Sequence, residues 1–169
     1  MKKYDDLGSF SEGLAEIRLG SKWGFINREL VEVIPCKYSS AELFSEGLAV
    51  VSLDGKFGYI DKAGKEVIQC KYDYAYDFIE GMALVRLDDN IGYINKEGKE
   101  VISLIYANGY EFCGGLAIVE SGCRMGFVDK KGEEVIPLIF DEVYDFKEDL
   151  AVVKLNGKCY FINKVGEEI

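Results

Sequence analysis

One short pattern returns every 34 residues along this chain, with no insertion or deletion between its copies. Its opening phenylalanine stands at Phe10, Phe44, Phe78, Phe112 and Phe146. A fixed period of this size is typical of repeat proteins, in which one supersecondary unit buries its apolar faces by stacking on the next. We therefore expect a single repeat domain over residues 1–169, with units that begin at these phenylalanines. Residues 1–9 are expected to be the tail of a preceding unit.

Three columns of small residues recur with the phenylalanine. The first is alanine, and the other two are glycine in four of the five copies: Ala15, Ala49, Ala83, Ala117 and Ala151; Gly24, Gly58, Gly92 and Gly126; Gly64, Gly98, Gly132 and Gly166. The exceptions are Tyr160 in the first glycine column and Leu30 in the second. Small side chains allow backbones to approach closely, so we expect these columns to lie where neighbouring units touch.

The residue pattern of each unit predicts three short strands joined by tight turns. In the second unit these are "GLAVVSL", "KFGYID" and "EVIQCKY". Asp54-Gly55 between the first two is a strong signal for a type I′ hairpin, and Gly64 is expected to take a left-handed conformation in the next turn. Branched residues interrupted by glycine argue against helices. The expected fold is all-β: a stack of five three-stranded antiparallel meanders of about 34 residues each.

The repeat resembles a known family, the WG (KWG) repeat proteins. The resemblance rests on Lys22-Trp23-Gly24, on the "EGLA" runs and on "GYIDKAGKEVI" at residues 58–68, and it covers essentially the whole chain. It implies a bacterial tandem β-repeat protein with a general interaction role and no defined activity. Arrays of differing copy number are typical of this family, which favours an open β-solenoid or superhelix. A closed five-bladed propeller-like ring is the alternative.

The net charge of the chain restricts the classes of partner that we expect. The cysteines and the N-terminal segment bear on the cellular compartment. The chain has 30 acidic and 20 basic residues, a net charge of −10. Nucleic acids and anionic membranes attract basic surfaces, so neither is an expected partner. The N-terminal segment lacks the apolar core of a secretory signal, and the five cysteines do not indicate a disulfide framework. We expect a cytoplasmic protein. The sequence does not indicate an oligomeric state.

The polar residues of the repeat give no pattern typical of catalysis. The chain has no histidine, which removes the common general base and the common zinc ligand. The carboxylates recur once per unit, so we expect them to serve turns and cross-strand pairs with lysine; the pairs are Glu66, Glu100 and Glu134 with Lys62, Lys96 and Lys130. Glu12, Glu46, Glu80 and Glu148 are expected to be solvated, with a cation-binding ladder as the alternative. We expect no enzyme activity, no cofactor and no metal.

Aromatic residues outside the repeating core are the best candidates for a binding surface. Tyr38, Tyr72, Tyr106 and Phe140 repeat every 34 residues, as core positions would. The connectors between units vary, and exposed tyrosine there is typical of recognition surfaces. The candidate partner-binding residues are Trp23, Tyr74, Tyr76, Tyr110 and Tyr144. The predicted function is a non-catalytic scaffold for another protein. The alternative is a carbohydrate or small-ligand binder that stacks sugars on Trp23 or the connector tyrosines.

Overall fold

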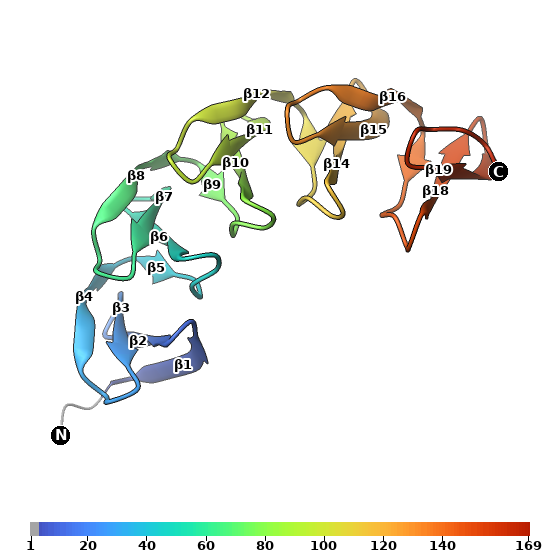
Figure 1. The fold of residues 1–169 in the computed structure, drawn as a ribbon. Coiled ribbons are helices and arrows are strands. Elements are labelled where there is room, and N and C mark those ends of the chain that lie inside the picture. The colour runs from blue at the N-terminus through green and yellow to red at the C-terminus, as the bar shows by residue number, and fades with distance from the viewer. Residues whose placement is uncertain (1–3) are drawn as a thin grey trace. The chain divides into compact units, whose positions relative to one another are not determined.

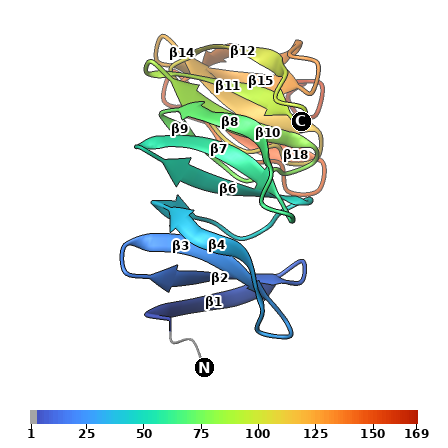
Figure 2. The same cartoon turned by 90° about the vertical axis from the view of Figure 1, so that its left-hand side faces the viewer.

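The computed structural model describes residues 4–169, and within that range it contains strands and turns but no helix. The strands form five separate antiparallel sheets, one for each repeat. Figure 1 labels the strands in chain order, and Figure 2 shows those of the first sheets side by side. The expected all-β fold of five antiparallel meanders is confirmed. Whether the units form an open stack or a closed ring stays a prediction.

Every repeat contributes the same hairpin. Its first strands are β2 (Leu14–Leu19), β6 (Leu48–Leu53), β10 (Met82–Leu87), β14 (Leu116–Ser121) and β18 (Leu150–Leu155). Its second strands are β3 (Lys22–Asn27), β7 (Lys56–Asp61), β11 (Asn90–Asn95), β15 (Arg124–Asp129) and β19 (Lys158–Asn163). The third strand of the meander follows in four repeats, as β4 (Glu32–Tyr38), β8 (Glu66–Tyr72), β12 (Glu100–Tyr106) and β16 (Glu134–Phe140).

The connectors add a strand that the sequence did not predict. Four of the sheets have four strands rather than three, and the fifth has three. The additional strands are β1 (Asp6–Ser11), β5 (Ser40–Ala41), β9 (Tyr74–Ala75), β13 (Asn108–Gly109) and β17 (Glu142–Val143). β5, for example, pairs Ser40 with Ser52 and Ala41 with Val51 of β6. The connector is therefore part of the sheet that follows it.

The turns that the sequence singled out have the predicted chemistry. Asp54 and Gly55 have φ of 52° and 79°, and Asn156 and Gly157 have 51° and 76°, as a type I′ hairpin requires. In the second turn, Asp61 Oδ1 accepts from the N–H groups of Ala63 and Lys65 at 3.0 and 2.9 Å. Asn or Asp therefore stands in this column because its side chain closes the turn.

The chain forms two compact parts. The first comprises residues up to Gly81 together with Lys96–Gly98, and the second comprises Met82–Asn95 together with Lys99–Ile169. In the first part the core holds Phe25, Phe44, Ala49 and Val51, all nearly inaccessible to solvent. The core of the second part is built from the same columns, with Phe127, Ile136, Ala151 and Val153 among its buried residues.

Consecutive repeats pack through contacts between aromatic side chains, one from each repeat. In the first part, Phe44 packs edge-on against Phe25 with 5.0 Å between ring centroids, and Phe78 packs on Tyr59 at 4.9 Å. In the second part, Phe146 packs on Phe127 at 5.0 Å. The opening phenylalanine of a repeat thus covers the aromatic residue in the second strand of the repeat before it.

The two glycine columns have different roles. Both were expected to lie where neighbouring repeats touch, and this is wrong for the first column. A Cβ on Gly58 would lie 2.5 Å from Ile68 O and 2.6 Å from Cys70 N, so this glycine admits the next strand of its own sheet. Gly64 does touch the neighbouring repeat, because a Cβ there would lie 3.2 Å from Ile34 Cγ1. Tyr160 stands in the Gly58 column, where β19 is the outer strand of its sheet.

Candidate functional site

The four candidate tyrosines in the connectors are exposed. The exposed fractions are 45% for Tyr74, 43% for Tyr76, 49% for Tyr110 and 56% for Tyr144. By contrast, Tyr38 and Tyr72 are buried, as their place in the repeat predicted. Exposure makes the four connector tyrosines accessible to a partner, and their role in binding stays a prediction.

Three aromatic rings form a cluster in the first part of the chain, which we call the aromatic cluster: Phe57, Tyr74 and Tyr76. Tyr74 contacts both of the others, with ring centroids 5.0 Å from Phe57 and 4.9 Å from Tyr76. Phe57 lies in β7 and is half-buried, while Tyr74 lies in β9. The sequence missed Phe57 as a member because it is 17 residues from Tyr74, and only the fold brings them together.

A buried hydroxyl holds the backbone of the aromatic cluster. Tyr59, completely buried in β7, donates a hydrogen bond to the carbonyl oxygen of Tyr76 at 2.7 Å. Burial raises the pKa of the Tyr59 phenol far above its ordinary value, so this hydroxyl keeps its proton at physiological pH. The connector is therefore fixed to the core of its own part, and the Tyr74 and Tyr76 rings stand on a rigid base.

An acidic residue, Asp77, directly follows Tyr76 of the aromatic cluster. It is half-buried, and burial raises the pKa of its carboxyl. The pKa of Glu42 is raised by burial and by the nearby charges of Asp77 and Glu16. The Glu42 carboxyl therefore lies near two other acidic groups. A cation brought near them would be attracted.

Trp23 occupies the same column as Phe57, one repeat earlier, and has different neighbours. It is half-buried in β3, and the Arg18 guanidinium carbon lies 5.7 Å from its ring centroid. The connector residue that corresponds to Tyr74 is Ser40, so this repeat has no second ring at that place. Trp23 is thus placed apart from the aromatic cluster and already holds a cation of its own chain.

In the second part, Tyr110 and Tyr144 occupy the column of Tyr76 in their own connectors. The carbonyl oxygen of Tyr110 accepts from the Tyr93 hydroxyl at 2.6 Å, which repeats the Tyr59 arrangement. The Tyr144 hydroxyl donates to Glu142 Oε2 at 3.1 Å, and Lys154 pairs with the same carboxylate. Tyr144 is therefore engaged in a polar contact of its own repeat.

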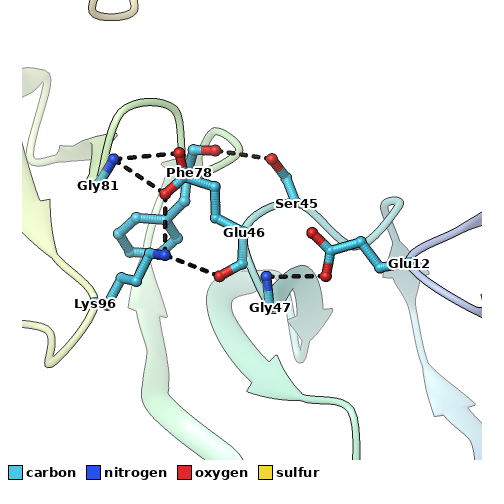
Figure 3. A network of polar contacts seen from close by, with 7 residues as sticks. All are labelled: Glu12, Ser45, Glu46, Gly47, Phe78, Gly81 and Lys96. Atoms are coloured by element: carbon cyan, nitrogen blue, oxygen red, sulfur yellow. Dashed lines mark hydrogen bonds and ion pairs between the residues drawn. The ribbon is translucent and has the colours of Figure 1, made fainter.

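The glutamates of the "EG" column join neighbouring repeats of the first part (Figure 3). Glu46 accepts from Gly81 N–H at 3.0 Å and pairs with Lys96 at 3.0 Å, and Lys96 also donates to Glu46 O. Glu12 likewise accepts from Gly47 N–H at 3.0 Å and pairs with Lys62 at 3.0 Å. The expected pairing of Lys62 and Lys96 with Glu66 and Glu100 is not what the structure shows. Lys62 and Lys96 instead form ion pairs with Glu12 and Glu46, the glutamates of the "EG" column.

The described residues show no cluster typical of a metal site. None of their His, Cys, Asp and Glu side chains gather in a group of three or more that could hold a metal ion. No helix within residues 4–169 is long and apolar enough to cross a membrane. The candidate site is therefore the aromatic cluster with the adjacent Asp77.

Comparison with known families gives one model that matches nearly the whole chain. It is described as "WG containing repeat", and it matches five times, at residues 2–23, 23–57, 57–90, 91–122 and 125–159. The matches have the period of the sheets. The comparison with curated proteins gave no match.

Solved structures share the fold at low sequence identity. A structure of a eukaryotic initiation factor matches with TM-score 0.57 and 14% identity, covering 95% of this chain and 52% of that one. Hsv2 of Kluyvelomyces marxianus matches with TM-score 0.54 and 11% identity, covering 94% and 57%. KlHsv2 with loop 6CD replaced by a Gly-Ser linker matches with TM-score 0.53 and 10% identity, covering 94% and 61%. This chain spans less than two thirds of each, and the likeness is one of fold alone.

Proposed function

This chain belongs to the WG containing repeat family, and we propose that its repeat scaffold is non-catalytic and binds another protein through the connector tyrosines. The observation that carries the proposal is the aromatic cluster. Phe57, Tyr74 and Tyr76 lie ring against ring, and both tyrosines are more than two fifths exposed. Tyrosine brings a large contact area with little rotamer entropy to lose, which is why it is common at interfaces.

The charge around the aromatic cluster supports a basic partner. The chain carries a net charge of −10, Asp77 directly follows Tyr76 of the cluster, and the Glu42 carboxyl lies near the charge of Asp77. An arginine or lysine of a partner would gain from the ring faces and from the carboxylates together. A basic segment that reached this surface would also lower the pKa values of both carboxyl groups, because its charge favours their ionised forms.

The test is capture of partners on the immobilised protein, with the Tyr74→Ala/Tyr76→Ala double variant beside the wild type. We expect a protein from a lysate of the source cell to be retained by the wild type and lost by the double variant. Tyr110→Ala tests whether the aromatic cluster carries the binding by itself, because it removes a connector tyrosine of similar exposure outside the cluster. A captured partner is then titrated against both proteins to measure its Kd.

Two results would contradict the proposal. One is equal capture by the wild type and the double variant, provided that circular dichroism shows both to be folded. The other is binding of a glycan, with loss on the same double variant and no protein captured. That second result would assign the aromatic cluster to the carbohydrate alternative.

A further inference from the structure

The fifth repeat presents an apolar face that the other repeats cover. Phe161 in β19 is 55% exposed, whereas the residues in its column at 25, 59, 93 and 127 are at most 2% exposed. Leu150 is 40% exposed, whereas Leu14 and Leu48 in its column are 7% and 8% exposed. With Val152, Tyr144, Glu148 and Cys159, they line a hollow of ≈ 770 Å³. We call this the outgoing face.

Inside the chain, such a face is covered by the opening phenylalanine of the next repeat. Phe44 on Phe25 and Phe146 on Phe127 each lie 5.0 Å from the ring they cover. Phe44 is 2% exposed as a result. The side chain that would complete the outgoing face is thus the opening phenylalanine of another repeat.

The first repeat presents such a phenylalanine. Phe10 stands in the column of Phe44 and is 41% exposed, and the guanidinium carbon of Arg28 in the same repeat lies 5.3 Å from its ring centroid. Leu30 and Leu7 lie in the same repeat, 72% and 62% exposed. We call this the incoming face. The two faces are the two halves of the contact that neighbouring repeats make inside the chain.

The polar groups of the two faces also match. Glu148 has φ of 59°, close to the 50° of Glu12 and the 51° of Glu46, so its side chain leaves the backbone in the same way. Glu12 holds the Gly47 N–H and Lys62 of the following repeats. On the incoming face, the columns of Gly47 and Lys62 hold Gly13 and Arg28. If the two faces met as neighbouring repeats do, Glu148 of one copy would have a donor N–H and a cation beside it on another.

The sheet of the fifth repeat has an open edge beside the outgoing face. In the other sheets a further strand covers the second strand of the hairpin, but β19 is the outer strand of its sheet, and the residues after it pair with its end: Glu168 bridges to Ile162, and Ile169 N–H donates to Phe161 O at 2.9 Å. An uncovered strand edge carries N–H and C=O groups that favour pairing with another chain. The edge and the hollow lie on the same repeat.

From these observations we propose that the chain associates head to tail with a second copy of itself. The incoming face of one copy packs on the outgoing face of another, with Phe10 on Phe161 and Glu148 beside Gly13 N–H and Arg28. The interface joins two different surfaces, so it does not close after one step, and each added copy exposes a new outgoing face. It uses none of the aromatic cluster, so it stands or falls apart from the proposed function.

The first test is the mass of the full chain in solution, measured by sedimentation velocity at concentrations up to about 1 mM. The mass is expected to grow with concentration. Phe10→Asp and Phe161→Asp are each expected to stay monomeric, because each spoils one face. Mixed together they are expected to form a dimer, since each retains the face that the other lacks. Ile105→Asp, at a residue 65% exposed on β12, is the control and should assemble like the wild type.

Three outcomes would overturn the proposal. A wild type that is monomeric at every concentration would do so. Oligomers that persist in both phenylalanine variants would assign the association to another surface. A mixture that stays monomeric, from variants that circular dichroism shows to be folded, would exclude a contact between two different faces.

The second test places a disulfide at the proposed contact. Trp23 and Tyr38 face each other across β3 and β4, and the same columns hold Cys159 on the outgoing face and Tyr4 before β1. Facing residues of antiparallel strands lie about 4.5–5.5 Å apart at Cα, within the range that a disulfide spans. Tyr4→Cys, in a chain whose other four cysteines are alanine, is expected to give a ladder of multiples on a non-reducing gel.

The ladder should vanish when Cys159 is also replaced by alanine. A disulfide within one chain would instead leave a single band at the monomer mass, which would mean that the chain closes on itself. That result, or the absence of any disulfide after oxidation, would overturn association between copies.

Discussion

At the scale of the residue, the first glycine column is the most restrictive position of the repeat. Gly58 faces the backbone of Ile68 and Cys70 in its own sheet, and neither atom belongs to a flexible side chain that could move away. We expect Gly58→Ala to destabilise the protein by about 2–4 kcal/mol, because a methyl group at 2.5 Å from a carbonyl oxygen forces the strands apart. Urea denaturation followed by circular dichroism measures the loss.

Gly55→Ala is the matched control for this prediction. Gly55 has φ of 79° in the hairpin turn, but a Cβ there meets nothing within 4 Å. Its loss should be only the cost of a left-handed alanine, about 1 kcal/mol. Equal losses in the two variants would show that conformation, rather than the close strand, determines why glycine recurs at position 58.

The buried tyrosines give a second prediction at this scale. Tyr59→Phe removes the hydroxyl that donates to Tyr76 O, and phenylalanine fits the column because Phe25 and Phe127 already occupy it. The expected loss is about 1 kcal/mol, since the carbonyl oxygen of Tyr76 loses its donor. Hydrogen exchange should also become faster at the Tyr76 connector than in the wild type. An unchanged stability would mean that water replaces the hydroxyl.

The same hydroxyl makes stability depend on alkaline pH. Burial raises the pKa of Tyr59 in the folded state above its unfolded value of about 10. Below that unfolded value the phenol is neutral in both states, and its contribution is fully present. As the pH rises above it, only the unfolded chain releases the proton, so the free energy of unfolding falls. The fall should be shallower in Tyr59→Phe when unfolding is measured from pH 8 to about 11.

The sequence predicted residue roles well where they depend on the local chain. Positive φ at Asp54-Gly55 and the closure of the next turn by Asp61 are properties of four or five consecutive residues. It did not predict that Gly58 is needed within its own sheet, because Ile68 approaches it only after a local irregularity in the pairing of β7 with β8. Such an irregularity leaves no mark on the alternation of apolar residues.

At the scale of the element, the ion pairs follow the stacking of repeats rather than the turn. Lys62 and Glu66 belong to one turn and were expected to pair, yet Lys62 reaches Glu12 of the repeat before it. The partner is 50 residues away in the sequence, and only the stacking of one sheet on another sets that distance. The two-residue strand β5 was missed because two residues are too few to show a period.

The Glu12 contact is testable by charge and by pH. The Lys62 hydrogen bond and charge lower the pKa of Glu12, with the Gly47 N–H as a further cause. Its contribution to stability is therefore present above the unfolded pKa of the carboxyl and is lost as the pH falls through the folded value. Glu12→Gln should cost about 0.5 kcal/mol at pH 7 in low salt, and nothing near pH 3 or in 1 M salt.

Thermal denaturation with Glu97→Gln as the control checks this prediction. Glu97 is an exposed glutamate in a turn of the third repeat, so its replacement removes the same charge without this contact. Glutamine keeps an oxygen that can accept from Gly47 N–H, so a loss in Glu12→Gln that persists in high salt would contradict the assignment of the effect to charge.

At the scale of the whole molecule, the candidate site was predicted only in part. The exposure of Tyr74 and Tyr76 followed from their place in variable connectors, which the period itself defines. Their contact with Phe57 did not, because Phe57 shares a column with Trp23, Ile91 and Met125, and the column is therefore variable too. A repeat predicts which positions face a neighbour, but variable positions meet only in the folded chain.

The repeat architecture also predicts how stability is distributed. Each unit gains stability mainly from its neighbours, so units with an uncovered face should open first. In the second part, β18 and β19 carry the exposed Leu150 and Phe161, whereas Ile118 and Phe127 of β14 and β15 are buried. We expect backbone amides of residues 150–163 to exchange with solvent deuterium faster than those of residues 116–129.

The first part should behave in the same way. Phe10 of the first repeat is 41% exposed and Phe44 of the second is 2% exposed, so residues 6–19 should exchange faster than residues 48–61. Hydrogen–deuterium exchange read by mass spectrometry at low micromolar concentration measures both comparisons. Uniform exchange rates would mean that the repeats open together and that coupling between units outweighs their separate stabilities. Repeating the measurement at high concentration adds a further result, because association through Phe10 and Phe161 would slow exchange in the first and fifth repeats and leave the others unchanged.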